Sequence, residues 1–119
     1  MDTLFRERFR VIALYDAYGQ MLTVHQRMLL RLYYLRDLSL GEIAERLEVS
    51  RQAIYDSVRR SVDELERLEH SLHALERRRI ITERTAALEG TIKALNGKVD
   101  QKTLDHLLDH VAAIRKTAS

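Results

Sequence analysis

The sequence lacks cysteine, proline and tryptophan altogether, and it contains only four glycines. The absence of cysteine excludes disulfides, cysteine-ligated zinc and thiol nucleophiles. The absence of tryptophan excludes an indole as the anchor of a ligand site. Proline and glycine disfavour helix interiors most strongly, so a chain this poor in them is expected to be all-helical. The 119 residues are 45% hydrophobic and 32% charged, which suits a core surrounded by solvated helices.

A strong excess of one charge is also missing. The net charge is +2, with ten basic and eight acidic side chains in residues 1–61 and ten of each in residues 62–119. A dedicated nucleic-acid-binding domain usually concentrates more positive charge. Uninterrupted apolar runs extend over a few residues only, so we expect no membrane insertion. The N-terminal MDTLFRERFR is amphipathic and unlike a signal peptide, and the expected location is the cytoplasm.

Apolar spacing and capping residues divide the first part of the chain into helices. A helix is expected over residues 4–18, with inward side chains at Leu4, Phe5, Phe9, Ile12, Ala13 and Tyr15. Two S/T-x-x-E/Q capping boxes, Thr23 with Gln26 and Ser39 with Glu42, open the next two helices. The first of these has an inward stripe at Val24, Met28, Leu29, Leu32 and Leu35.

Residues 39–60, SLGEIAERLEVSRQAIYDSVRR, have the pattern of two short helices joined by a tight turn. The turn is Leu47-Glu48-Val49, and Ser50 caps a helix that begins at Arg51. Many such turns have glycine at the place of Glu48, because φ there is often positive. The expected centre of this helix-turn-helix is a core of six side chains: Ile43, Ala44, Leu47, Val49, Ile54 and Val58.

With Ile54 and Val58 inward, the helix from Arg51 turns six side chains outward: Arg51, Gln52, Tyr55, Asp56, Arg59 and Arg60. In a DNA-reading protein this face enters the major groove, where glutamine pairs with adenine and arginine with guanine. Asp56 can accept from cytosine, but phosphates repel it, and phosphate contacts supply most non-specific affinity. The face is therefore compatible with nucleic acid, with a protein partner, or with an exposed surface of mixed charge.

The helix from Arg51 has no stop signal before about residue 81, so it is expected to extend beyond the helix-turn-helix domain. Spacings of three and four residues give it a heptad seam of leucines: Leu65, Leu68, Leu72 and Leu75. Left exposed, this seam would be an apolar patch of a kind that soluble monomers avoid, which predicts a homodimer. The predicted domains are a helix-turn-helix domain, residues 1–61, and a helical dimerisation region, residues 62–119. In that region Asn96-Gly97 marks a turn, and Asp100 caps a last helix with inward residues Leu104, Leu107, Leu108, Val111 and Ile114.

Other polar groups carry weaker signals. A basic patch either contacts phosphates or is solvated surface, and it consists of Arg77, Arg78, Arg79 and Arg84. His106 and His110 have the i,i+4 spacing of metal ligands, but a third ligand is missing. For this pair, and likewise for His70 and His73, an exposed polar stripe on a helix is the stronger interpretation. Neither a metal site nor a cofactor is therefore predicted. Glycine-rich phosphate loops, paired carboxylates and a nucleophile with its base are also missing, so we do not expect an enzyme.

The run MLTVHQRMLLRLYYLRDLSLGEIAERLEVSRQAIYDSVRR resembles the YlxM-type helix-turn-helix proteins, a bacterial family similar to region four of sigma factors. The blocks SLGEIAE and VSRQAIYD carry the resemblance, which covers roughly residues 10–75. The family is linked to the signal recognition particle through operons shared with its GTPase. The resemblance therefore implies an all-α, sigma-70 region-four-like domain with a helical extension, forming a dimer.

It also implies an accessory or regulatory role in co-translational protein targeting, with the particle's GTPase or its RNA as partner. Asp56 and the low net charge favour this role, together with weak DNA binding of little sequence preference. The helix-turn-helix pattern itself favours the alternative, a DNA-binding transcriptional regulator. A purely structural dimeric module is the third interpretation.

Overall fold

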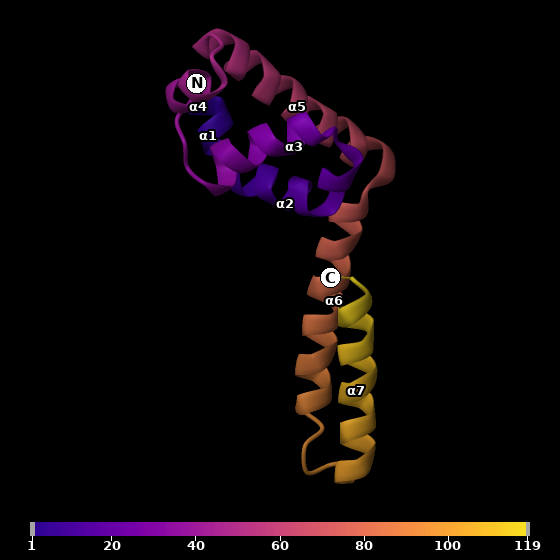
Figure 1. Cartoon of the computed structure of the whole chain (residues 1–119). Helices are drawn as coiled ribbons and strands as arrows, with labels where there is room; N and C mark the ends of the chain where they lie inside the picture. Colours follow the sequence, from indigo (N-terminus) through magenta and orange to yellow (C-terminus); the bar gives the residue numbers. More distant parts are fainter. Residues whose placement is uncertain (1, 119) are drawn as a thin grey trace. The chain divides into compact units, whose positions relative to one another are not determined.

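The computed structural model describes residues 2–118 as two compact units, one up to His73 and one from Ala74. The first unit contains α1 (Asp2–Arg6), α2 (Arg8–Tyr18), the 3-10 helix η1 (Gly19–Met21), α3 (Val24–Leu30), the π-helical turn η2 (Arg31–Leu35), α4 (Leu40–Leu47) and α5 (Arg51–Leu72). The second contains α6 (Ala74–Lys93) and α7 (Gln101–Thr117) (Figure 1). Residues 2–118 contain no strand, which confirms the predicted all-α class. None of the described helices is long and apolar enough to cross a membrane.

The first unit is organised around α5, which packs against α2, α3 and α4. Its core consists of apolar side chains with almost no exposed surface, among them Val11, Leu14, Leu29, Leu30, Ile43, Ile54, Val58 and Leu65. Burying one such aliphatic side chain contributes roughly 1.5–3 kcal/mol relative to leaving it in water. The core therefore holds one side of α5 against three other helices and leaves the opposite side exposed.

The N-terminal helix predicted for residues 4–18 is broken at Glu7, which separates α1 from α2. Glu7 has φ −90° and ψ 14°, outside the helical range, so the inward stripe changes phase at this point. Leu4 remains buried, whereas the predicted inward residues Phe5 and Phe9 are 62% and 84% exposed. The buried residues of α2 are instead Val11, Leu14 and Tyr18.

Both predicted capping boxes are present. The Thr23 Oγ1 accepts from Gln26 N at 3.1 Å, and the Gln26 Oε1 accepts from Thr23 N at 3.0 Å. Ser39 and Glu42 exchange the same two bonds at 3.0 and 2.9 Å, and these bonds lower the pKa of Glu42. Because each box satisfies two backbone donors that a helix start leaves unpaired, the beginnings of α3 and α4 agree with the sequence.

The stripe predicted for the helix after Thr23 is only partly correct. Val24, the first residue of α3, is 71% exposed. Leu35 is 48% exposed, because α3 widens into the π-helical turn η2. The extra residue in that turn rotates Tyr34 into the core, where its hydroxyl donates to Leu4 O at 3.1 Å. Burial raises the pKa of Tyr34, so the hydroxyl keeps its proton for this bond.

The long helix predicted to continue to about residue 81 ends at Leu72. His73 has the left-handed values φ 55° and ψ 27°, and its N–H donates to Glu69 O at 2.8 Å. The helix ends here without a glycine or proline to mark its C-terminus. The leucine spacing therefore predicted a helix that continued past this residue. The two units consequently divide at His73, whereas the sequence placed the division after residue 61.

The predicted dimer seam is not a continuous surface. Leu65 is fully buried in the core of the first unit, because the helices around α5 reach further along it than expected. Leu68 is half-buried, Leu72 is 42% exposed, and Leu75 follows the break at His73. The prediction that these four leucines form one exposed seam is therefore wrong.

The second unit is an antiparallel hairpin of α6 and α7 (Figure 1). Its small core contains Ile92, Leu104 and Val111, against which Leu95, Leu107 and Leu108 pack. The predicted turn is present, with Gly97 at φ 85°, and Asp100 is the residue before α7. Ile114, predicted inward, is 46% exposed.

Candidate functional site

The turn between α4 and α5 determines how α5 is presented. Glu48 ends α4 in the left-handed conformation, with φ 57° and ψ 45°, as the position of glycine in similar turns led us to expect. Val49 N–H then donates to Ala44 O at 3.0 Å, and Ser50 Oγ accepts from Ala53 N at 3.0 Å. Ser50 is thus the N-cap of α5, as predicted. Val49 is 48% exposed and does not belong to the core, because the left-handed residue before it turns the chain outward.

The remaining predicted core residues pack between α4 and the inward side of α5. Ile43, Ala44, Ile54 and Val58 are all at most 5% exposed, and Leu47 is half-buried. Because Ile54 and Val58 occupy the side of α5 that packs against α4, the opposite side of the first turns of α5 faces solvent. All six predicted site residues lie there, with Tyr55 half-buried and the other five exposed: Arg51, Gln52, Tyr55, Asp56, Arg59 and Arg60. We call this set the α5 face.

Polar partners on α5 itself engage several side chains of this face. Gln52 Nε2 donates to Asp56 Oδ1 at 3.0 Å, and Arg59 Nε lies 3.3 Å from Asp63 Oδ1. Arg60 donates more weakly to Ser57 Oγ at 3.4 Å. The Gln52 amide would have to leave Asp56 to bind a base edge, and the carboxylate would remain in the middle of the face. The α5 face is therefore a surface of mixed charge.

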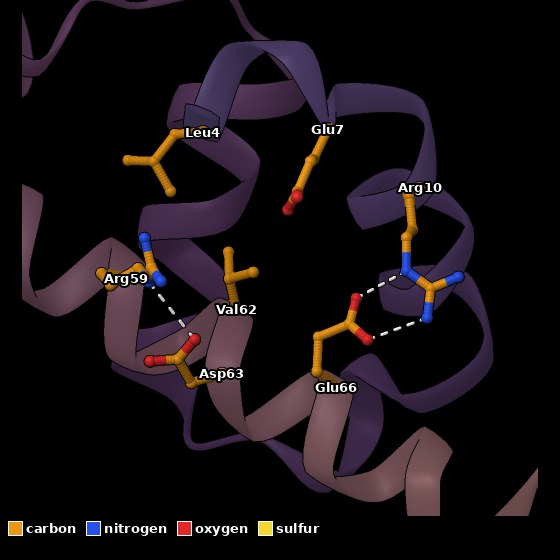
Figure 2. Close-up of a pocket in the computed structure, with 7 residues that line it drawn as sticks. All are labelled: Leu4, Glu7, Arg10, Arg59, Val62, Asp63 and Glu66. Carbon is orange, nitrogen blue, oxygen red and sulfur yellow. Dashed lines mark hydrogen bonds and ion pairs between the residues drawn. The ribbon is translucent and has the colours of Figure 1, made fainter. Parts of the chain in front are cut away.

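A cavity lies beside the α5 face, between α5 and the N-terminal helices (Figure 2). It measures about 350 Å³, and charged side chains line most of it: Glu7, Arg10, Arg59, Asp63 and Glu66, with Leu4 and Val62. Arg10 binds Glu66 through two bonds of 2.6 and 2.8 Å, which raise the pKa of Arg10. Three carboxylates against two guanidiniums make this cavity unsuited to a phosphate. Sequence reasoning missed it, since Arg10 and Glu66 are 56 residues apart and nothing in their spacing links them.

A second cavity of about 430 Å³ adjoins the start of α5. Arg51 lies at its edge, together with Phe5, Tyr33 and the Arg8–Asp37 ion pair of 2.5 Å. The exposed Phe5 is thus part of a partly apolar rim next to the α5 face, and the guanidinium of Arg8 lies 5.9 Å from the centre of its ring. The sequence contained no sign of this arrangement, because it depends on the helix break at Glu7.

The predicted basic patch lies on α6 and does not form a single cationic surface. Arg79 binds Glu76 at 2.7 Å and Glu83 at 2.6 Å, and these bonds raise the pKa of Arg79. Arg77 and Arg84 point to one side of α6, whereas Arg78 and Arg79 point to two others. A phosphate would meet at most two of the four.

The histidine pairs lie on separate helices. The rings of His70 and His73 have centroids 6.4 Å apart at the end of α5, and His106 and His110 are exposed on α7. Among residues 2–118, no three His, Asp or Glu side chains are grouped in a way that could hold a metal ion.

A capped turn, a helix anchored on one side and a polar face on the other define a helix-turn-helix protein. The chain belongs to the family UPF0122, described as "Putative helix-turn-helix protein, YlxM / p13 like", whose model matches residues 5–107. The resemblance to YlxM-type proteins is thereby confirmed.

Several curated relatives share this family name. The UPF0122 protein GK1195 of Geobacillus kaustophilus is 51% identical over 84 residues, which are 68% of this chain and 76% of that protein. The UPF0122 protein of Pediococcus pentosaceus is 41% identical over 101 residues, covering 84% of this chain and 87% of its own. The UPF0122 protein of Clostridium kluyveri is 38% identical over 105 residues, covering 88% and 95%. The second unit therefore also has counterparts in relatives.

Proposed function

We propose that this chain is a non-enzymatic accessory or regulatory protein of the signal recognition particle pathway, and that its α5 face binds the particle's GTPase. The pathway comes from the resemblance to YlxM-type proteins, which are linked to that GTPase through shared operons. The kind of partner comes from the chemistry of the face. Protein interfaces favour tyrosine and arginine and match charges of both signs, and the α5 face contains these residues together with Asp56.

The observation that carries the proposal is the bond between Gln52 and Asp56. It keeps a carboxylate at the centre of the face, with Asp63 beside Arg59 at its edge. A nucleic-acid backbone presents only negative charge, so each of these carboxylates opposes it. A protein partner can pair Asp56 with a cation and Arg51 or Arg60 with a carboxylate.

Reversing the charge of Asp56 tests the proposal and separates the two components of the particle. Asp56→Arg should weaken binding to the purified GTPase by at least about tenfold, which corresponds to about 1.4 kcal/mol. The same variant should strengthen binding to the particle's RNA if RNA is the true partner. Asp109→Arg on α7 makes the same change in net charge at an exposed residue that does not belong to the face, and serves as the matched control. No measurable binding of the wild type to either component would refute the proposal.

One observation favours a second candidate, a DNA-binding transcriptional regulator. All three arginines of the α5 face are exposed on the first turns of α5, which follows the turn capped by Ser50. In DNA-binding helix-turn-helix proteins the corresponding helix enters the major groove. In that case Asp56→Asn should tighten non-specific DNA binding, because it removes a repelled charge. Arg59→Ala should weaken DNA binding and reduce its salt slope by about one.

A further inference from the structure

The outer surface of α3 and η2 contains two adjoining cavities. The first measures about 560 Å³, and residues of α2, η1, α3 and η2 line it: Tyr15, Asp16, Gly19, Gln20, Arg27 and Arg31. The second measures about 310 Å³, and its lining consists of Met28, Arg31, Leu32 and Arg36. Because Arg31 lines both, the cavities meet at this residue, and we call them together the α3 groove.

The charge of the α3 groove differs from that of the cavity beside the α5 face. Its lining contains three guanidiniums, those of Arg27, Arg31 and Arg36, and the single carboxylate of Asp16. The cavity beside the α5 face has three carboxylates against two guanidiniums. Guanidiniums bind phosphate oxygens through short, charge-assisted hydrogen bonds that are often bidentate. The excess of cations therefore suits the α3 groove to a ligand with several phosphates.

Two of these cations are arranged to receive an anion. Arg27 Nη1 donates to Leu22 O at 3.0 Å and to Gln20 O at 3.3 Å, so backbone carbonyls hold this guanidinium in place. Within residues 2–118, neither Arg27 nor Arg31 is paired with a carboxylate. A guanidinium that is already positioned loses less side-chain entropy when a ligand binds. A phosphate would therefore meet one fixed and one mobile cation.

The π-helical turn η2 adds the third cation. Arg36 N–H donates to Arg31 O at 2.9 Å, so the chain completes a turn over five residues. In an α-helix, residues 31 and 36 would point about 140° apart. The wider turn brings them closer in direction, and both line the second cavity. Such π-turns occur frequently at functional sites, and α-helical periodicity does not reveal this one.

Tyr15 contributes an aromatic ring at the other end of the α3 groove. The ring lies against Gly19, where a Cβ atom would come within 3.2–3.3 Å of three ring atoms. Gly19 has the ordinary helical φ of −53°, so the close ring and not the backbone conformation favours glycine there. The ring is half-buried and lines the first cavity. Aromatic faces of this kind stack with nucleobases of any identity.

We propose that the α3 groove binds a nucleoside polyphosphate. The base stacks on Tyr15, and the phosphates extend from Arg27 towards Arg36. Asp16 can accept from a ribose hydroxyl, which is a common role of a carboxylate in nucleotide sites. The first cavity, at about 560 Å³, falls within the range of small-molecule sites. The α3 groove shares no residue with the α5 face, so this proposal does not depend on the function proposed for that face.

Isothermal titration calorimetry of the full chain with ATP, ADP and AMP, without divalent cations, tests the proposal. ATP should bind with a dissociation constant below about 1 mM. Affinity should fall from ATP to ADP to AMP, because each lost phosphate removes negative charge from the contact with the arginines. GTP should bind about as well as ATP, since stacking on a tyrosine discriminates little between bases.

Substitutions on α3 and α4 test the cations. Arg31→Ala should weaken ATP binding by about tenfold or more. Arg31 is exposed and its side chain has no carboxylate partner among the described residues, so thermal unfolding should be unchanged. Arg46→Ala removes the same charge at an exposed residue of α4 outside the groove and should leave ATP binding unchanged.

The aromatic contact is tested separately. Tyr15→Ala should weaken ATP binding by roughly fivefold to a hundredfold, whereas Tyr15→Phe should retain it. Gly19→Ala keeps the backbone conformation but displaces the ring, and should also weaken ATP binding. This second variant keeps the test decisive if Tyr15→Ala loses stability. Inorganic tripolyphosphate, which has no base, should bind less tightly than ATP.

Three results would overturn the proposal. The first is that ATP shows no saturable binding to the wild type, including the case in which a single-stranded RNA oligonucleotide binds and ATP does not. The second is that Arg46→Ala weakens ATP binding as much as Arg31→Ala does. The third is that tripolyphosphate binds as tightly as ATP, which would exclude a stacked base.

Discussion

Replacing Glu48 by glycine should stabilise the protein, although it removes a side chain. Glu48 is exposed and left-handed at φ 57°, where an L-residue costs roughly 1–2 kcal/mol relative to its preferred conformations. Glycine relieves this strain but loses about 0.5–1 kcal/mol through the greater freedom of the unfolded chain. The net gain should be about 0.5–1 kcal/mol. The helix-ending bond from the Glu48 N–H to Ala44 O needs no side chain and is retained.

The matched control is Glu45→Gly, the same exchange three residues earlier within α4. Glu45 is exposed and helical, so glycine there should destabilise by about 1 kcal/mol. Urea unfolding followed by circular dichroism measures both free energies, and a change of 1 kcal/mol shifts the melting temperature by about 4–8 °C in a domain of this size. A destabilised Glu48→Gly variant would show that Glu48 is not strained, and would contradict a left-handed residue in the turn between α4 and α5.

Other substitutions test the core, the cap and one ion pair. Ile54→Ala should cost about 2–5 kcal/mol in urea unfolding, and a value near zero would place Ile54 outside the core. Ser39→Ala should cost about 0.5–2 kcal/mol through loss of the capping box, and an unchanged stability would contradict that cap. Lys93 and Arg115 bind Glu89 at 3.0 and 2.9 Å. In NMR titrations the pKa of Glu89 should lie below its ordinary value, so its pairing stabilises at neutral pH and is lost as pH falls through the folded pKa. Arg115→Ala should raise that pKa, and no change would argue against the ion pair closing the hairpin.

Local signals in the sequence predicted the central part of the fold correctly. The capping boxes, the Ser50 cap and the buried pair Ile54 and Val58 all depend on residues within one or two turns of each other. Periodicity also oriented the α5 face, because a helix with one buried side has only one other side to expose. The six residues of that face therefore lie on the outward side of α5, as periodicity predicted, whereas their role as a binding site is a proposal.

Predictions failed where a helix changes its geometry without the usual breakers. Glu7 and His73 interrupt helices although neither is glycine or proline, and the π-helical turn at Tyr34 changes the phase of a stripe. Each interruption moved apolar residues between core and surface, as for Phe9 and Leu35. Tertiary packing stabilises these helix interruptions, and the free energy of packing cannot be inferred from residues that are neighbours in the sequence. The cavity at Arg10 was missed for the same reason, since it depends on which helices meet.

We propose that the α5 face serves a protein partner of the targeting machinery and does not recognise duplex DNA by its sequence. Titrating the wild-type chain with duplex DNA of random and selected sequences, at low and at physiological salt, tests this most directly. We expect weak binding that falls steeply with salt and differs little among sequences, because Asp56 stays at the centre of the face. Nanomolar binding to one sequence at physiological salt would contradict it and establish the chain as a transcriptional regulator.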